Sequence, residues 1–501
     1  MNTLLIYPEF PHTFWSYTHA LRYIGKRAVL PPLGLLTVAA LLPKSWQVRL
    51  VDLNVGPLKR HDLAWAEQVF VSAMAVQQDS ARRVIAQCQA AGLRVVAGGP
   101  LFTSQRDSFP EVDHLVLNEA ELTLPLFLAD LAAGRPQRVY ATKEWAQMEA
   151  SPVPRFELAD LRRYAMMPIQ YSRGCPFDCE FCDVTAQLGH LPRFKSAPQM
   201  VAELDRLQEI GWKSSVFWVD DNLIGNKRHL QTEVLPAVRE WQTRHRPTAF
   251  NSQVSINLAD DPALIDQMAR AGFNTVFIGI ETPDHTALAG CHKKQNLNRD
   301  LLADVRRIQA AGIQVQGGFI VGFDQDSTNI FHRQVGFIQA SGIVTAMVGV
   351  LQAMRGTKLY ERLQREKRLT SESGGNNVAS FSNFEPLMGT AQLREGYGYV
   401  LRTIYSPRSY YERVRVFLRN YQRPRIQAPL AWQDLRAFAR SMVMLGIVGR
   451  ERFEYWRLLV WTIFHRPRLL PMAVYLSVLG NHYRGICQKY LRVLKTPTPA
   501  T

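Results

Sequence analysis

Three cysteines, Cys175, Cys179 and Cys182, occupy one short stretch of the chain. Thiolates this close together on one loop can hold a soft metal centre. A [4Fe–4S] cluster has four irons, so three cysteines leave one iron open to bind and activate a ligand, as the open position of a catalytic zinc does. We therefore interpret the stretch, which follows a predicted strand beginning at Pro168, as the ligand loop of an iron–sulfur cluster.

The alternative is a structural zinc site that uses His190 as its fourth ligand. Structural zinc sites usually arrange their cysteines as two knuckles, and the Cys-x3-Cys-x2-Cys spacing does not match that arrangement. Cys88, Cys291 and Cys487 stand alone in the sequence, so the cysteines do not suggest a disulfide framework either. A metal site in a reducing compartment fits better, and we expect a cytoplasmic protein because the N-terminus does not resemble a signal peptide.

The loop from Tyr171 to Cys182, with the aromatic Phe181 before the third cysteine, resembles the signature loop of the radical S-adenosylmethionine (SAM) superfamily. The resemblance implies that SAM chelates the open iron through its amino and carboxylate groups. It also implies that one electron, from a reductant such as flavodoxin or ferredoxin, splits SAM and gives a 5′-deoxyadenosyl radical. That radical abstracts hydrogen from an unactivated C–H bond of a small-molecule or lipid substrate.

The loop needs a scaffold, and residues 167–370 alternate six apolar strands with six helices. Six units are too few for an eight-stranded barrel, so we predict a partial (β/α)6 barrel with its site at the carboxyl ends of the strands. By the resemblance, the residues that contact SAM are Phe181, Asp220, Asp221, Asn222, Gln253, Ser255, Glu281, Gly318, Phe319 and Gly322. The alternative for the acidic residues is that each caps the helix that follows its strand.

Residues 1–134 form a second alternating series, with nearly continuous apolar strands separated by helices. This pattern predicts an α/β fold with a Rossmann-like, doubly wound sheet that is covered on both faces. Ligands of such sheets bind at the carboxyl ends of the strands. Residues 135–166 are rich in proline and lose the pattern, so we expect a linker there.

A Rossmann-like domain before this barrel resembles the cobalamin-binding domain of class B radical SAM enzymes. The stretches that carry the resemblance are 31–35, 72–74 and 98–100, and they imply cobalamin as a third cofactor. The residues expected to contact it are Asp52, Asn54, Ser72, Met74, Gly98, Gly99 and Pro100. Many such domains supply a cobalt-ligating histidine where this chain has Asn54, so we expect no histidine ligand from this loop. The alternative is a degenerate domain used for packing.

Residues 371–501 are predicted to form a helical extension that carries most of the positive charge. The chain has a net charge of +16, and residues 401–501 contain 18 Lys or Arg against 4 Asp or Glu. Arginines alternate there with large apolar side chains in runs too short to span a bilayer. Helices on an anionic membrane surface are our preferred interpretation. Plain packing and, less favoured, nucleic-acid binding are the alternatives.

The segments Val219–Asn222 and Gly279–Pro283, with the order of domains and the basic extension, resemble the class B group that contains the hopanoid C-2 methylase. This resemblance implies a cobalamin-dependent methyltransferase that acts on an unactivated carbon of a hopanoid or other lipid. Rearrangement or oxidative cyclisation without methyl transfer is the alternative enzyme hypothesis. A non-catalytic iron–sulfur or membrane-surface protein is the alternative outside enzymology.

Overall fold

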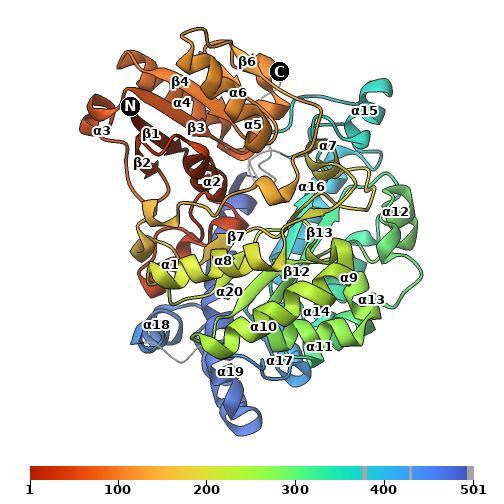
Figure 1. Ribbon diagram of the computed structural model, residues 1–501. Coiled ribbons are helices and arrows are strands. Elements are labelled where there is room, and N and C mark those ends of the chain that lie inside the picture. Colours follow the sequence, from red (N-terminus) through yellow and green to blue (C-terminus); the bar gives the residue numbers. More distant parts are fainter. Residues whose placement is uncertain (375–380, 428–431, 494–501) are drawn as a thin grey trace.

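Two six-stranded parallel sheets organise the part of the chain that the computed structural model describes, residues 1–374, 381–427 and 432–493. Figure 1 shows the first sheet and its helices as one layered unit, with the second sheet and its helices beside it. Three helices from the last part of the chain, α17 (Pro407–Asn420), α18 (Trp432–Val443) and α19 (Arg452–His465), lie at the end of the molecule opposite the first sheet, whereas α16 (Thr390–Ile404) lies between the two units. This arrangement confirms the predicted α/β architecture with a helical C-terminal region.

The first sheet has the strand order β2-β1-β3-β4-β5-β6. Its strands are β1 (Asn2–Tyr7), β2 (Gln47–Asp52), β3 (Gln68–Ser72), β4 (Arg94–Gly98), β5 (His114–Val116) and β6 (Val139–Tyr140). Its helices are α2 (Leu33–Leu41), α3 (Arg60–Trp65), α4 (Gln78–Ala90), α5 (Pro100–Ser104) and α6 (Ala120–Ala132). Separate apolar cores lie on its two faces, as expected for strands that are apolar throughout. The chain reverses direction across the sheet between β1 and β3, which is where doubly wound sheets open a ligand crevice.

β6 lies inside the stretch that the sequence suggested as a linker. Its two residues pair with the end of β5 and extend the sheet by one strand. The boundary of the first domain at residue 134 therefore stays a prediction.

The second sheet has the order β14-β13-β12-β11-β10-β7, and all its pairs are parallel. Its strands are β7 (Met167–Ile169), β10 (Val216–Trp218), β11 (Phe250–Gln253), β12 (Phe273–Glu281), β13 (Gln314–Val321) and β14 (Ala346–Val350). The larger helices around it are α8 (Ala197–Glu209), α10 (Leu235–Arg244), α11 (Pro262–Ala271), α13 (Leu301–Ala310) and α14 (Ile330–Ser341). Shorter elements are α7 (Val184–Leu188), α9 (Lys227–His229), α12 (His285–Gly290), α15 (Lys358–Arg365) and the antiparallel pair β8 (Ser172–Arg173) and β9 (Arg193–Phe194).

The C-terminal helices pack against two separate parts of the preceding chain, the N-terminal helix α1 and the second unit. They are α16 (Thr390–Ile404), α17 (Pro407–Asn420), α18 (Trp432–Val443), α19 (Arg452–His465) and α20 (Leu470–Val493), with a π-helical turn η11 (Met444–Val448) after α18. α16 and α17 contact α14 of the second sheet, whereas α18 and α20 contact α1 (Thr18–Ile24) near the N-terminus. Among the described residues, we find no helix that combines the length and the hydropathy needed to cross a membrane.

Candidate functional site

The cysteine loop leaves the end of β8 through a glycine that its geometry requires. Gly174 has φ of +93°, and a Cβ placed there would lie 2.9 Å from the carbonyl oxygen of Leu191. The backbone N–H of Cys175 donates to Gly189 at 3.2 Å, and that of Cys182 donates to Cys179 at 3.1 Å. The loop is therefore folded tightly on itself, and the thiols of Cys175 and Cys182 both lie within electrostatic range of Cys179.

Glu180, between the second and third cysteines, anchors this loop to two distant segments. Its carboxylate accepts hydrogen bonds from Arg362 of α15, at 2.6 Å from Nε and 3.2 Å from Nη2. Its backbone N–H donates to the carbonyl oxygen of Cys291 at 3.0 Å. Bidentate Arg–carboxylate pairs fix geometry as well as adding energy, so the loop is held before any cofactor binds.

The thiols share one electrostatic environment. Burial raises the pKa of Cys182 to about 12, and burial also raises that of Cys175; the neighbouring Cys179 adds to both effects. Burial alone would lower the pKa of Lys293, but the carboxylate of Glu281 and the thiols of Cys179 and Cys182 raise it above its usual value. Three thiols beside a buried cation suit an anionic iron–sulfur cluster, whose thiolate ligands must lose their protons on assembly. Within the described ranges, no three His, Cys, Asp or Glu side chains converge closely enough for a single metal ion.

Three residues that we did not single out from the sequence adjoin the cysteine loop. Lys293 Nζ donates to Glu281 Oε1 at 2.7 Å, and Gln295 Nε2 approaches Cys179 Sγ at 3.6 Å. Cys291 is buried near Cys179 and Glu281, which raise its pKa beyond the effect of burial. The only available signal was the polar run Cys291–Gln295 soon after the strand that ends at Glu281.

Asp220 holds the strand that leads into the cysteine loop. The carboxylate is fully buried and accepts from Ser172 Oγ at 2.6 Å, from the Ser172 backbone N–H, and from the Tyr171 backbone N–H at 3.4 Å. Burial raises the pKa of Asp220 to about 6, although these hydrogen bonds oppose the shift. Asn222 links neighbouring strand ends in a similar way, because its Oδ1 accepts from the Ser255 backbone N–H at 3.1 Å.

The other residues expected at SAM have different orientations. Phe181 packs edge-on against Phe323, at 5.9 Å between ring centroids. The ring of Phe319 lies in the helix layer, 6.1 Å from that of Phe337 in α14, so only its backbone can face the opposite side of the sheet. Gln253 and Gly318 are half-buried on β11 and β13, and Gly322 donates its backbone N–H to Asp326 at 2.8 Å. Glu281, at φ of +63°, ends β12 beside Lys293.

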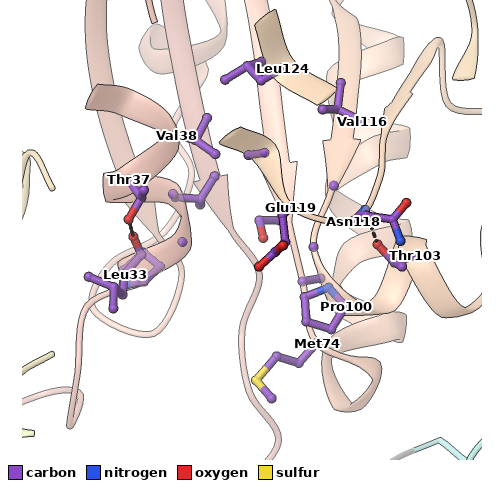
Figure 2. Close-up of a pocket in the computed structure, with 18 of the residues that line it drawn as sticks. Leu33, Thr37, Val38, Met74, Pro100, Thr103, Val116, Asn118, Glu119 and Leu124 are labelled. Atoms are coloured by element: carbon purple, nitrogen blue, oxygen red, sulfur yellow. Dashed lines mark hydrogen bonds between the residues drawn. The ribbon is translucent and has the colours of Figure 1, made fainter. Parts of the chain in front are cut away.

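A cavity of about 450 Å³ lies between the strand ends of the first sheet and the cysteine-bearing unit. Figure 2 shows Leu33, Thr37 and Val38 of α2 on one side, Thr103 and Asn118 on the other, and Met74 and Pro100 at one end. The lining contains five of the residues expected at cobalamin, which are Ser72, Met74, Gly98, Gly99 and Pro100. The second unit contributes Gln170, Arg173 and Asp221 among others. The cavity therefore joins the two sheets.

Asp52 and Asn54 do not line this cavity. Asp52 ends β2 at the edge of the sheet and Asn54 follows it; Asn54 Nδ2 donates to Asp52 Oδ1 at 2.7 Å. Tyr164 donates its hydroxyl to Asp52 Oδ2 at 2.9 Å, and Asn54 Oδ1 accepts from the Phe10 backbone N–H at 2.8 Å. In this structure, both side chains join the edge strand to neighbouring segments.

Buried ion pairs connect the first unit to the second at the wall of the cavity. Arg173 donates to Glu119 at 3.0 Å and to Glu121 at 2.8 Å, and Arg193 donates to Glu119 at 2.7 Å. Asp221 stands nearby, and burial together with the carboxylates of Asp220 and Asp183 raises its pKa to about 7. The wall between the cavity and the cysteine loop therefore contains buried charged groups, and its two arginines are paired with Glu119 and Glu121.

Comparison with known proteins agrees with this geometry. Residues 169–330 match the model of the radical SAM superfamily, and residues 357–495 match a domain of unknown function, DUF4070. An uncharacterized methyltransferase of Synechocystis is 39% identical over 96% of this chain and 91% of its own length. The hopanoid C-2 methylase of Rhodopseudomonas palustris is 34% identical over 91% of this chain and 88% of its own length.

A solved structure shares the fold across nearly the whole chain. The cobalamin-dependent SAM radical enzyme OxsB, with aqua-cobalamin and SAM bound, superposes with a TM-score of 0.62 at 13% identity, covering 98% of this chain and 80% of OxsB. The folded cysteine loop, the strand ends beside it and these matches lead to one conclusion. The chain belongs to the radical SAM superfamily and is homologous to the cobalamin-dependent radical SAM methyltransferases, including hopanoid C-2 methylase.

Proposed function

We propose that this enzyme uses cobalamin to transfer a methyl group from SAM to an unactivated carbon of a hopanoid-like lipid. The observation that carries the proposal is the 34% identity to hopanoid C-2 methylase over 91% of this chain. That match extends through both sheets and into the C-terminal helices, so it includes more than the shared cysteine loop. The expected products are a methylated lipid, S-adenosylhomocysteine and 5′-deoxyadenosine.

The cavity at the ends of β3 and β4 supports cobalamin as the second cofactor. It lies at the crevice where doubly wound sheets bind ligands, and its other wall belongs to the unit that carries the cysteines. Gly34 lines it, and a Cβ added there would have no other heavy atom within 4 Å. No histidine is among the described residues that line it, so we expect bound cobalamin without protein imidazole on cobalt.

The cofactors supply a reducible cluster, a cleavable sulfonium and a methyl carrier; the chain's own residues position them. Cys175, Cys179 and Cys182 would hold the cluster, and Lys293 places positive charge beside these thiols. Asp220 fixes the strand before the loop, and Glu180 fixes the loop itself. Ser72, Met74 and the residues 98–100 would lie against cobalamin at the strand ends.

The proposal is tested by product analysis after anaerobic reconstitution with iron, sulfide and cobalamin. Incubation with a reductant, SAM labelled in its methyl group and a hopanoid should give a labelled hopanoid together with both SAM-derived products. The Cys179→Ala variant should give none of them. Release of 5′-deoxyadenosine without S-adenosylhomocysteine would instead indicate radical chemistry without methyl transfer. If the hopanoid stays unmethylated while another acceptor is methylated efficiently, the hopanoid-like substrate is rejected but the methyltransferase activity is not.

Cobalamin binding has a separate test in Gly34→Phe, which adds a ring at the cavity. Because Gly34 is exposed and surrounded by open space, the fold should tolerate the ring. We expect at least about tenfold weaker cobalamin binding in equilibrium dialysis, because losing about 1.4 kcal/mol of binding free energy raises the Kd tenfold. Gly56, which also has no neighbour within 4 Å but lies outside the cavity, provides a matched control as Gly56→Phe. Equal affinity in both variants would argue against this cavity.

A further inference from the structure

α19 has apolar side chains on two opposite faces, and only one of them is covered. Tyr455, Leu458, Leu459 and Thr462 are buried, where the helix contacts α17, α20 and η11. The opposite face carries Phe453 and Phe464, which are 76% and 80% exposed. A helix that is apolar all around is normally buried, so the uncovered face points to a partner.

The uncovered face continues onto the turn before α19. The exposed apolar residues of η11 and α19, together with Val443 at the end of α18, form what we call the α19 patch: Val443, Met444, Ile447, Val448, Phe453, Trp456, Val460, Ile463 and Phe464. η11 contacts α19 directly, and Trp456 Nε1 donates to the carbonyl oxygen of Gly446 at 2.9 Å. Figure 1 shows α19 projecting from the end of the molecule opposite the first sheet. A projecting, continuous apolar surface of this kind marks an interaction site.

The charged residues around the patch indicate what kind of surface it can bind. Residues 443–468 contain five arginines and two glutamates. Glu451 is buried against Arg484, and Glu454 is half-buried near Arg457. Arg450, Arg452, Arg457 and Arg468 are exposed around the apolar side chains. The accessible charge is therefore almost entirely positive.

We infer that the α19 patch docks on an anionic membrane surface, with its aromatic side chains in the interface and its arginines among the lipid headgroups. Amphipathic helices of this composition lie in the plane of the interface, and each arginine there is attracted by anionic lipid. A second copy of this chain fits less well, because a twofold contact would place the same basic surface against itself. This inference does not depend on which substrate the enzyme methylates.

The test is flotation of the reconstituted full-length protein with vesicles of phosphatidylglycerol mixed with phosphatidylcholine, compared with pure phosphatidylcholine. The protein should float with the anionic vesicles, and added salt should weaken binding without abolishing it, because salt screens the arginines but not the apolar contacts. Combining Phe453→Glu with Phe464→Glu should weaken binding at least about tenfold, since two aromatic side chains no longer enter the interface. Leu126→Glu, a change at an exposed leucine of α6 in the first unit, should bind like the parent protein.

Release of 5′-deoxyadenosine should be unchanged in the double variant, and this result would show that its fold is intact. Loss of vesicle binding can therefore be distinguished from failure of the methyltransferase proposal. Parent protein that stays unbound with both vesicles would overturn the inference. So would a double variant that binds as tightly as the parent. A self-association that the double variant abolishes in sedimentation velocity, with no vesicle binding, would assign the patch to a second copy and also overturn it.

Discussion

Lys293 places a buried positive charge beside the thiols of the cysteine loop. It is paired with Glu281 at 2.7 Å, and both side chains are largely buried. Its position could not be read from the sequence, because a lysine twelve residues after Glu281 looks like any surface lysine. The hairpin-like return of the chain after α12, with His292 at φ of +58°, turns it back toward the cluster loop.

We predict that Lys293→Met costs about 3 kcal/mol of unfolding free energy, because it leaves the Glu281 carboxylate buried without its cation. Adding Glu281→Gln should recover most of this loss. Chemical denaturation of the two single variants and the double variant measures the coupling. A double variant that is less stable than Lys293→Met would show that the pair does not interact as described.

Asp221 gives the protein a specific pH dependence. Its carboxyl group has a pKa of about 7 in the folded protein against 3.8 as the reference value. Between these values the unfolded chain releases a proton that the folded protein keeps, so this group's stability contribution falls as pH rises toward 7. We expect Asp221→Asn to be more stable than the parent by about 1 kcal/mol at pH 8, with a smaller gain at pH 6. Thermal unfolding of the reconstituted, SAM-free proteins checks this; a gain that grows toward low pH would contradict it.

At the scale of elements, the contact between β8 and the start of α6 joins the two sheets. Arg173 of β8 reaches Glu119 and Glu121 of the first unit, and these side chains are 13%, 3% and 3% exposed. Charged groups buried in this way are costly to separate from their partners. The pairing therefore sets how the cavity wall is assembled.

Arg173→Met should destabilise the protein by about 3 kcal/mol, because Glu121 loses its bidentate partner in a buried position. Arg162→Met removes a comparable hydrogen-bonded pair with Asp160, but Arg162 is 87% exposed, so this change should cost much less stability than Arg173→Met. Both values come from denaturant unfolding under the same conditions. Equal losses in the two variants would mean that burial does not strengthen the effect of the Arg173 contact.

The elements themselves were largely predictable from the sequence. The five longer strands of the first sheet appear where nearly continuous apolar runs, such as Leu4–Ile6, predict buried parallel strands. β6 was missed because two residues carry too little pattern to stand out. Asp52 and Asn54 were expected in the crevice because they lie at the carboxyl end of a strand. The strand order, which puts β2 at the edge of the sheet, comes from long-range pairing that the sequence does not reveal. The inward or outward direction of Phe319 likewise depends on the register of β13.

At the scale of the whole molecule, the fold places one cavity and one cysteine loop on either side of a shared polar wall. The first sheet supplies the cavity, the second supplies the loop, and the C-terminal helices close the assembly against α1 and α14. Neither sheet alone contains both sites. Cofactor chemistry that couples the cavity to the cysteine loop therefore requires both of these units.

The central claim is that Cys175, Cys179 and Cys182 hold the cluster that cleaves SAM. The most direct measurement is release of 5′-deoxyadenosine from SAM by anaerobically reconstituted protein with a strong reductant, for the parent, Cys179→Ala and Cys88→Ala. Cys88 is a buried cysteine of the first unit, distant from the loop in the sequence, and serves as the control. We predict release by the parent and by Cys88→Ala, and none by Cys179→Ala. Undiminished release by Cys179→Ala would contradict the account.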